Sequence, residues 1–420
     1  MKRGTVWKWT KRTLWSLGLV VIVAYIGLCV WVRVNETRLI FIRNRPYIPP
    51  SPSLALNQQR VEFAGAEGTK FFAWVVPNSS EDTSKLWVLF FHGSEENVSI
   101  HSNDYDDFRS MGFSIMAPEY PGYLDSPGVP GESIIEREAQ AAYDYLRRIK
   151  QVPPGNIVIY GYSLGSAVAI NLASHVEAAA LIILSGFSSM VSIGQHEFPF
   201  LPIRLLLKNK FESDITIGRV NMPVLVIHST EYDRFHPFPH GQRLYDLAPF
   251  PKQLLRIRGG PTQGPLTSAL VNPNFFSEIA TFLNAHTAFH LHQPLPSIAP
   301  VIAATIDSNG IEASVAQYRS LRTGNPNGFN FREAELSRLG AQLLRQKKTN
   351  EAITVLKLNA EQYPQSFSVF DSLGDAYVAA GNTAEAMRNY QQSVTLFPDN
   401  QNSSRVKLDE LQRKSASPLP

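Results

Sequence analysis

Residues 161–165 read GYSLG and fit the pattern G-x-S-x-G, which can present a serine as a nucleophile. An apolar, β-branched run from Ile157 to Tyr160 leads into the pattern, and small residues typical of a buried helix follow it. This context predicts a strained strand-to-helix turn that lifts the Ser163 hydroxyl clear of a sheet, where it can attack a carbonyl carbon. The alternative is an ordinary strand-to-helix turn without chemistry.

A second segment predicts how the negative charge formed in such an attack would be held. An apolar run ending at Phe91 leads into His92-Gly93-Ser94. Oxyanion holes of this kind use one backbone N–H from the loop after such a strand and one from the residue after the nucleophile. We therefore expect the N–H groups of Ser94 and Leu164 to hold the oxyanion. His92 is interpreted as a structural hydrogen-bonding residue beneath that loop.

A sheet must position both segments. From Val61 to about Phe282, short β-branched or aromatic runs alternate with longer helical patterns. Several of the short runs are apolar throughout, as strands covered on both faces are. The expected fold class is therefore α/β, with a mostly parallel, doubly wound sheet. The expected strands are 71–76, 86–91, 113–118, 157–160, 181–184, 224–228 and 254–257.

These segments, taken in order, resemble a known family. The chain reads FFHGSEEN at 90–97, EYPGYLDSPGVPGE at 119–132, GYSLGS at 161–166 and MPVLVIHSTEYDRFHPFPHG at 222–241. From roughly Arg38 to Phe282 it is similar to the membrane-anchored branch of the α/β-hydrolase superfamily. The resemblance implies the α/β-hydrolase fold. It also implies hydrolysis of an ester, thioester or amide by Ser163, without a cofactor or a metal.

The resemblance further implies an acid in the loop after the strand at 224–228. Aligned backwards from Phe238, the acid falls on Asp233 with one inserted residue, and Glu231 is the alternative. Either carboxylate would orient an imidazole and stabilise its cation. The remaining interpretation is that both are surface acids of the loop.

The family's histidine is missing from its expected place. Where the family has Gly-Gly-His, this chain has Gly259-Gly260-Pro261, and no histidine lies between His240 and His286. Proline cannot accept a proton, and loss of the base lowers the rate of a serine hydrolase by a factor on the order of a million. His236 and His240, which flank the acid loop, are the candidates for a displaced base.

The N-terminal segment 13–32 carries no charge over 20 residues, the length that a helix needs to cross a bilayer. It contains Cys29, the chain's only cysteine, so the rest of the chain has no thiol for a disulfide, a zinc site or a cysteine nucleophile. The segment is too long for the apolar part of a cleaved signal peptide, and we interpret it as a signal anchor. The basic residues on its two sides, five before and four after, predict a cytoplasmic N-terminus. The body would then lie on the periplasmic or extracellular side.

The C-terminal part is expected to form helical repeats. Leu339-Gly340, Ala352 and Pro364 recur 34 residues later as Leu373-Gly374, Ala386 and Pro398, which is the period of tetratricopeptide repeats. The tail resembles the tetratricopeptide extension that follows several bacterial hydrolase-like domains. Two repeats cannot bury their faces alone, so we expect a capping helix near 405–414 and a protein partner.

Four parts of the chain follow from these patterns. They are a transmembrane anchor at 13–32, a hydrolase domain at 38–290, a linker with a short helix at 291–330, and two repeats with a capping helix at 331–414. Within the hydrolase domain, residues 198–211 (FPFLPIRLLLKNKF) resemble the family's lid-like insertion. Such a segment would cover the site or touch a membrane, and we favour a packed lid.

The composition excludes one class of function and leaves two open. The net charge of +3 is too small for a nucleic-acid-binding protein, and no basic run interleaves with aromatic residues after residue 45. The chain is then either a membrane-anchored serine hydrolase with a displaced base or a catalytically inactive α/β-hydrolase scaffold. In the second case, its repeats would bind a protein partner.

Overall fold

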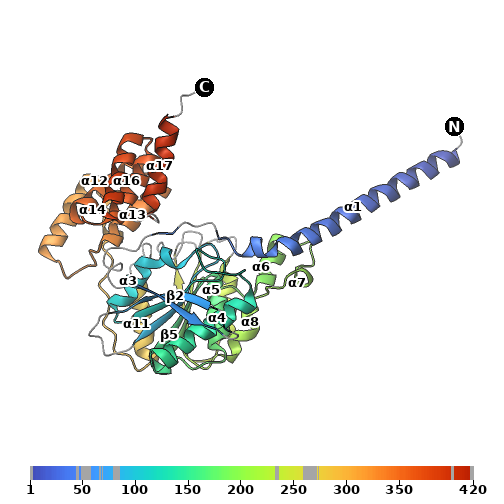
Figure 1. The fold of residues 1–420 in the computed structure, drawn as a ribbon, viewed down its shortest axis with the longest axis horizontal. Coiled ribbons are helices and arrows are strands. Elements are labelled where there is room, and N and C mark those ends of the chain that lie inside the picture. The colour runs from blue at the N-terminus through green and yellow to red at the C-terminus, as the bar shows by residue number, and fades with distance from the viewer. Residues whose placement is uncertain are drawn as a thin grey trace.

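The computed structural model describes residues 3–43, 47–48, 58–65, 68, 70–78, 86–231, 236–258, 272, 274–398 and 402–416. Figure 1 shows a long N-terminal helix that projects from an α/β body, and a bundle of helices at the C-terminal end.

The body is built on one eight-stranded sheet with the order β1-β2-β4-β3-β5-β6-β7-β8. Strand β2 runs antiparallel to both of its neighbours, β1 and β4, and all later pairs are parallel. The expected α/β fold with a mostly parallel sheet is therefore confirmed. The strands are β1 (Gln59–Ala64), β2 (Lys70–Val76), β3 (Trp87–Phe91), β4 (Ser114–Pro118), β5 (Ile157–Tyr162), β6 (Ala180–Leu184), β7 (Val224–Ser229) and β8 (Lys252–Ile257).

Helices cover both faces of the sheet and give it two separate apolar cores. Successive residues of one strand point to opposite faces, so Phe90 of β3 lies in one core and Phe91 in the other. This is why the central strands are apolar throughout. The helices of the body are α3 (Ser102–Ser110), α4 (Glu132–Asp144), α5 (Leu164–Ala173), α6 (Met190–Glu197), α7 (Ile203–Leu206), α8 (Ser213–Thr216), α9 (Phe238–Leu247) and α11 (Phe275–His286).

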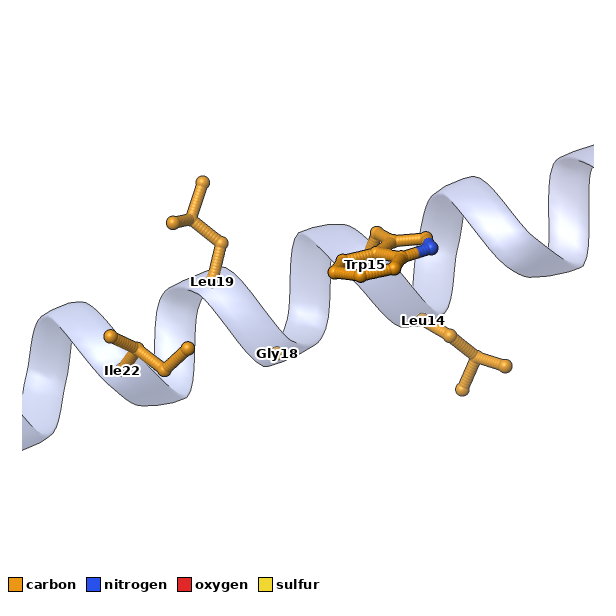
Figure 2. Close-up of a pocket in the computed structure, with 5 residues that line it drawn as sticks. All are labelled: Leu14, Trp15, Gly18, Leu19 and Ile22. Carbon is orange, nitrogen blue, oxygen red and sulfur yellow. The ribbon is translucent and has the colours of Figure 1, made fainter.

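The N-terminal helix α1 (Arg3–Ile40) is long and apolar enough to cross a membrane from Thr13 to Ile40, with a mean hydropathy of 2.4. Figure 2 shows a notch beside Gly18, lined by neighbouring side chains of the same helix. Because α1 alone lines the notch, it is a feature of the helix surface and not an enclosed binding site. The other end of α1 is tied to the body, where Val32 and Phe41 are buried.

The C-terminal helices pack in pairs. Gly340 and Gly374, which are 34 residues apart, allow the two helices of each repeat to approach closely. A Cβ at Gly340 would lie 2.5 Å from Leu356, and one at Gly374 would lie 2.4 Å from Tyr390. The helices are α12 (Ala299–Gly324), α13 (Glu333–Arg345), α14 (Thr349–Gln362), α15 (Phe367–Ala379), α16 (Thr383–Leu396) and α17 (Ser403–Ala416).

Helix α12 lies in the segment that the sequence suggested as a linker with a short helix. It consists of two helical halves, 299–309 and 311–324, which meet at Gly310, whose φ of 85° and ψ of 173° are not helical. The two halves bury Ile302 and Tyr318 in the same core as α13 and α14. The capping helix expected near 405–414 corresponds to α17, which contributes Leu408 to the core of the second repeat.

The repeat helices are joined to the α/β body by buried charges. Arg338 of α13 donates to Asp107 of α3 at 2.6 Å and to Glu335 at 3.2 Å. Arg332 also bonds to Asp107. The side chains of Arg338 and Asp107 are only 4% and 6% exposed, so this ion pair is largely removed from water.

Candidate active site

Ser163 occupies the turn between β5 and α5. Its backbone has φ 52° and ψ −116°, a conformation that is strained for a residue with a side chain. The Ser163 N–H donates to Leu184 O at 3.0 Å, which ties the turn to the end of the neighbouring strand β6. The serine is therefore held at the carboxyl edge of the parallel strands.

The two glycines of the turn are sterically required. A Cβ on Gly161 would lie 2.2 Å from Gly165 O, and a Cβ on Gly165 would lie 2.1 Å from Phe91 O. Both contacts are with backbone, which cannot rotate away. The second contact also shows that the first turn of α5 packs directly against the end of β3.

His236 lies against the serine. Its Nε2 is 3.1 Å from Ser163 Oγ, a hydrogen-bond distance. His236 belongs to the loop between β7 and α9, and its ring centre is 6.1 Å from that of Phe187, which follows β6. Segments at the ends of β5, β6 and β7 thus converge on the Ser163 hydroxyl.

His228 positions the loop that carries His236. Its Nε2 donates to His236 O at 2.9 Å, and its side chain is fully buried at the end of β7. A Cβ on Gly241 of α9 would lie 2.4 Å from His228 Cγ, so the ring is held between the strand and the helix. The sequence analysis did not identify this residue, although a histidine that ends an apolar strand is an available signal.

His240, the other candidate base, bonds to a different residue. Its Nδ1 accepts hydrogen bonds from Ser188 Oγ at 2.8 Å and from Ser188 N at 3.3 Å. Burial, with smaller effects from the nearby charges of His236 and His228, lowers the pKa of His240 to about 4. The neutral imidazole of His240 therefore accepts from Ser188, whereas His236 contacts the serine.

The loop expected to supply an oxyanion donor is held by hydrogen bonds to its carbonyl groups. Tyr123 Oη donates to Ser94 O at 2.7 Å, and Tyr120 Oη donates to His92 O at 2.9 Å. On the other side of the turn, Leu164 is the first residue of α5, where backbone N–H groups have no partner within the helix. The loop and the start of α5 lie together because Gly165 allows them to approach.

His92 lies beneath this loop, in agreement with a structural role. Its Nε2 is 3.0 Å from Glu119 Oε1, and both side chains are fully buried. Glu119 Oε2 also accepts from Val98 N at 3.1 Å. The pair links the end of β3 to the residue that follows β4.

A second buried group supports the same loop. His101 contacts Glu96 Oε2 through Nε2 and Asp104 Oδ2 through Nδ1, both at 2.9 Å. Burial alone would lower the pKa of His101, but the two carboxylates outweigh it and raise the pKa to about 10. Glu96 in turn accepts from Gly93 N at 3.3 Å, so the charged histidine stabilises the segment next to Ser94.

The remaining predicted residues are less informative. Asp233 and Pro261 lie outside the described residues. Glu231 is exposed, and its N–H donates to Ser229 Oγ at 3.1 Å. The acid of the site therefore remains a prediction.

Comparison with known proteins gives matches in both parts of the chain. A family model described as a tetratricopeptide repeat-like domain matches residues 303–413. The uncharacterized protein Rv2307c of Mycobacterium tuberculosis is 30% identical over 246 residues, which are 58% of this chain and 87% of that protein. The human alpha/beta hydrolase domain-containing protein 17C is 33% identical over 178 residues, which are 42% of this chain and 53% of that protein.

Solved structures also match this chain. The esterase Pf2001 of Pyrococcus furiosus has a TM-score of 0.48 and 18% identity, and the match covers 58% of this chain and 99% of the esterase. The sheet order described above is that of an α/β hydrolase, and the human relative carries the same family name. The chain thus has the α/β-hydrolase fold and α/β-hydrolase homologues by sequence, and it carries a tetratricopeptide repeat-like domain at residues 303–413.

Proposed function

We propose that this protein is a membrane-anchored serine hydrolase in which His236 replaces the histidine that the family has at the position of Pro261. The observation that carries the proposal is the 3.1 Å contact between Ser163 Oγ and His236 Nε2. The proposed reaction is the hydrolysis of an ester, thioester or amide bond.

The displacement of the base is physically reasonable. The loops after β7 and β8 leave neighbouring parallel strands at the same edge of the sheet, so a histidine from either can approach a serine at the end of β5. Triads are defined by geometry and not by the loop that supplies each residue. A base in the loop after β7 is therefore compatible with the fold.

In the proposed mechanism, His236 Nε2 accepts the proton of the Ser163 hydroxyl as Oγ attacks the carbonyl carbon. The N–H groups of Leu164 and Ser94 hold the oxyanion of the tetrahedral intermediate. The protonated His236 then donates its proton to the leaving group, and an acyl-serine remains. Water, deprotonated by the same imidazole, hydrolyses the acyl-serine. A carboxylate of the same loop, Asp233 or Glu231, would stabilise the imidazolium.

The other parts of the chain have proposed roles in location and recognition. The apolar helix α1 is compatible with a single-pass anchor or a signal, and we propose an anchor with the hydrolase domain on the extracytoplasmic side. The tetratricopeptide repeat-like domain is a typical protein-interaction module, and we propose that it binds a protein partner.

The alternative is a catalytically inactive scaffold that acts through its repeats. Two observations favour it: proline stands where the family has its histidine, and the repeat-like match extends over residues 303–413. In such a protein, Ser163 would not be activated and the contact with His236 would be structural.

A fluorophosphonate probe distinguishes the two functions, because it labels only activated serines. The full chain in detergent micelles is treated alongside Ser163→Ala, His236→Gln and His240→Gln variants. We expect labelling of the parent protein, none for Ser163→Ala, and a rate reduced by a factor on the order of a million for His236→Gln, which lacks the base. His240→Gln, which removes a group bonded to Ser188, should keep most of the rate.

Two results would contradict this proposal. Labelling of His236→Gln at the parent rate would mean that another residue is the base. Absence of labelling in the folded parent protein would favour the scaffold.

A further inference from the structure

The segment between β6 and α8 forms an insertion with two different faces. This insertion, residues 190–207, contains α6 and α7. Its inner face packs against α1, where Leu201, Ile203 and Val32 form a buried apolar cluster with Leu28 partly buried beside it. Figure 1 shows α6 and α7 next to the end of α1 that enters the body.

A hydrogen bond defines how far the insertion extends along α1. Tyr25 Oη donates to Phe200 O at 3.0 Å. Tyr25 lies seven residues before Val32, where the uncharged stretch ends, which corresponds to about 10 Å along a helix axis. The contact therefore lies well inside the apolar stretch and not at its end.

This position matters if α1 crosses a bilayer, as proposed above. The hydrocarbon core is about 30 Å thick and needs about 20 helical residues. If the bilayer ended at Tyr25, only residues 13–24 would remain, or about 18 Å of helix. The span must then include Tyr25, and Phe200 lies at the same depth.

The outer face of the insertion is apolar where it would meet lipid. The side chain of Phe200 is 61% exposed and that of Leu205 is 83% exposed, and the neighbouring Pro199 and Pro202 are also exposed. Exposed apolar side chains of this size, next to an apolar helix that is itself uncovered, form one continuous surface.

Polar residues appear at the same level on α1 and on the insertion. On α1, the first charges after the apolar stretch are Arg33 and Glu36. Within the apolar run 198–207 of the insertion, Arg204 is the one charged residue, and it pairs with Glu212 at 2.7 Å. The run ends at Lys208, whose N–H donates to Glu36 Oε1 at 2.8 Å. Two segments that are distant in the sequence thus change from apolar to charged at one depth, as segments that cross the same membrane boundary do.

We infer that the insertion dips into the lipid leaflet on the side of the hydrolase domain. Phe200 and Leu205 contact acyl chains, and Lys208 lies at the level of the headgroups. The inference rests on the proposed membrane anchoring. It also brings the candidate active site close to the lipid surface, because the insertion begins three residues after Phe187, whose ring faces that of His236.

The test measures the depth of single labelled positions. Full-length variants with Cys29→Ser receive one cysteine each, at Phe200, Phe250 or Val21, labelled with the environment-sensitive dye NBD. They are reconstituted into vesicles of phosphatidylcholine and phosphatidylglycerol, with or without lipids that carry a quenching doxyl group on the acyl chain. Phe250 is the matched control, because it is an aromatic residue with 83% exposure. It precedes the amino end of β8, whereas the insertion follows the carboxyl end of β6.

We expect doxyl lipids to quench the dye in Phe200→Cys and Val21→Cys but not in Phe250→Cys. Quenching at Val21 without quenching at Phe200 would overturn the inference and leave the anchor intact. Quenching at none of the three positions would overturn both the inference and the membrane anchoring. The fluorophosphonate experiment tests the serine chemistry separately.

Discussion

The strain at Ser163 predicts an unusual order of stability between two variants. Ser163→Ala and Ser163→Gly both remove the hydroxyl and its contact with His236. They differ in the backbone, because alanine keeps a Cβ at φ 52° and ψ −116° whereas glycine adopts this conformation without strain.

The expected magnitude follows from two opposing terms. A strained backbone conformation of this kind costs about 1–3 kcal/mol, which the glycine variant avoids. Glycine also gives the unfolded chain more freedom, which destabilises the folded state by about 0.4–1 kcal/mol relative to alanine. The difference favours Ser163→Gly over Ser163→Ala by about 1 kcal/mol.

Thermal unfolding of the full chain in detergent measures this difference. In a domain of about 150–250 residues, 1 kcal/mol corresponds to a change in Tm of about 2–4 °C. The matched control is the exposed position Thr281 in the middle of α11. There the usual order should hold, with the glycine variant less stable than the alanine variant by about 0.8–1.0 kcal/mol.

If Ser163→Gly were less stable than Ser163→Ala, by a margin similar to that at Thr281, the turn would not store strain. The interpretation of Ser163 as the residue of a strained nucleophile turn would then be refuted. The result does not depend on whether the enzyme is active.

Two further predictions concern buried charges. Arg338→Ala should destabilise the packing of the repeats on the body by at most about 3–5 kcal/mol, because it removes one of the two arginines bonded to the buried Asp107 and leaves only Arg332. Arg319→Ala, which breaks an exposed pair, should cost less than about 1 kcal/mol. Limited proteolysis and thermal unfolding compare the two variants. The pKa of His240 is lowered to about 4 in the folded protein, whereas its ordinary value is 6.5. Between these two pH values, His240 is protonated in the unfolded chain but largely neutral in the folded protein. The stability contributed by neutral His240 is therefore fully present above pH 6.5 and is lost as the pH falls through about 4. His240→Gln should reduce this loss in urea unfolding measured from pH 7 to pH 4, and an unchanged pH profile would contradict the assignment.

Much of the fold could be predicted because its signals are local. The central strands of the body are apolar runs, and the structure places a strand at each of the seven expected positions. Strand β1 is not among them, since it is an edge strand whose residues are mostly exposed and only half of them apolar. The second half of α12, residues 311–324, corresponds to the short helix expected in the linker, whereas the first half, 299–309, is not indicated by the sequence pattern.

The insertion could be identified from its composition, but the directions in which its side chains point could not. The sequence 198–211 is apolar and basic, and this composition by itself favours a packed lid over a membrane contact. In the structure, Leu201 and Ile203 are packed against α1, whereas Phe200 and Leu205 are exposed. Alternate residues of one short segment thus face opposite ways, which no composition reveals.

The sequence by itself determined the serine turn, since a strand, two glycines and a helix are adjacent in the chain and their geometry depends on neighbouring residues. Only the tertiary structure decided which histidine meets the serine. Ser163 and His236 are 73 residues apart in the sequence. The two candidate histidines, His236 and His240, are only four residues apart. The choice depends on His228, which bonds the backbone of His236, and on Ser188, which holds His240. Such contacts arise from the packing of several strand ends, and no local pattern encodes them.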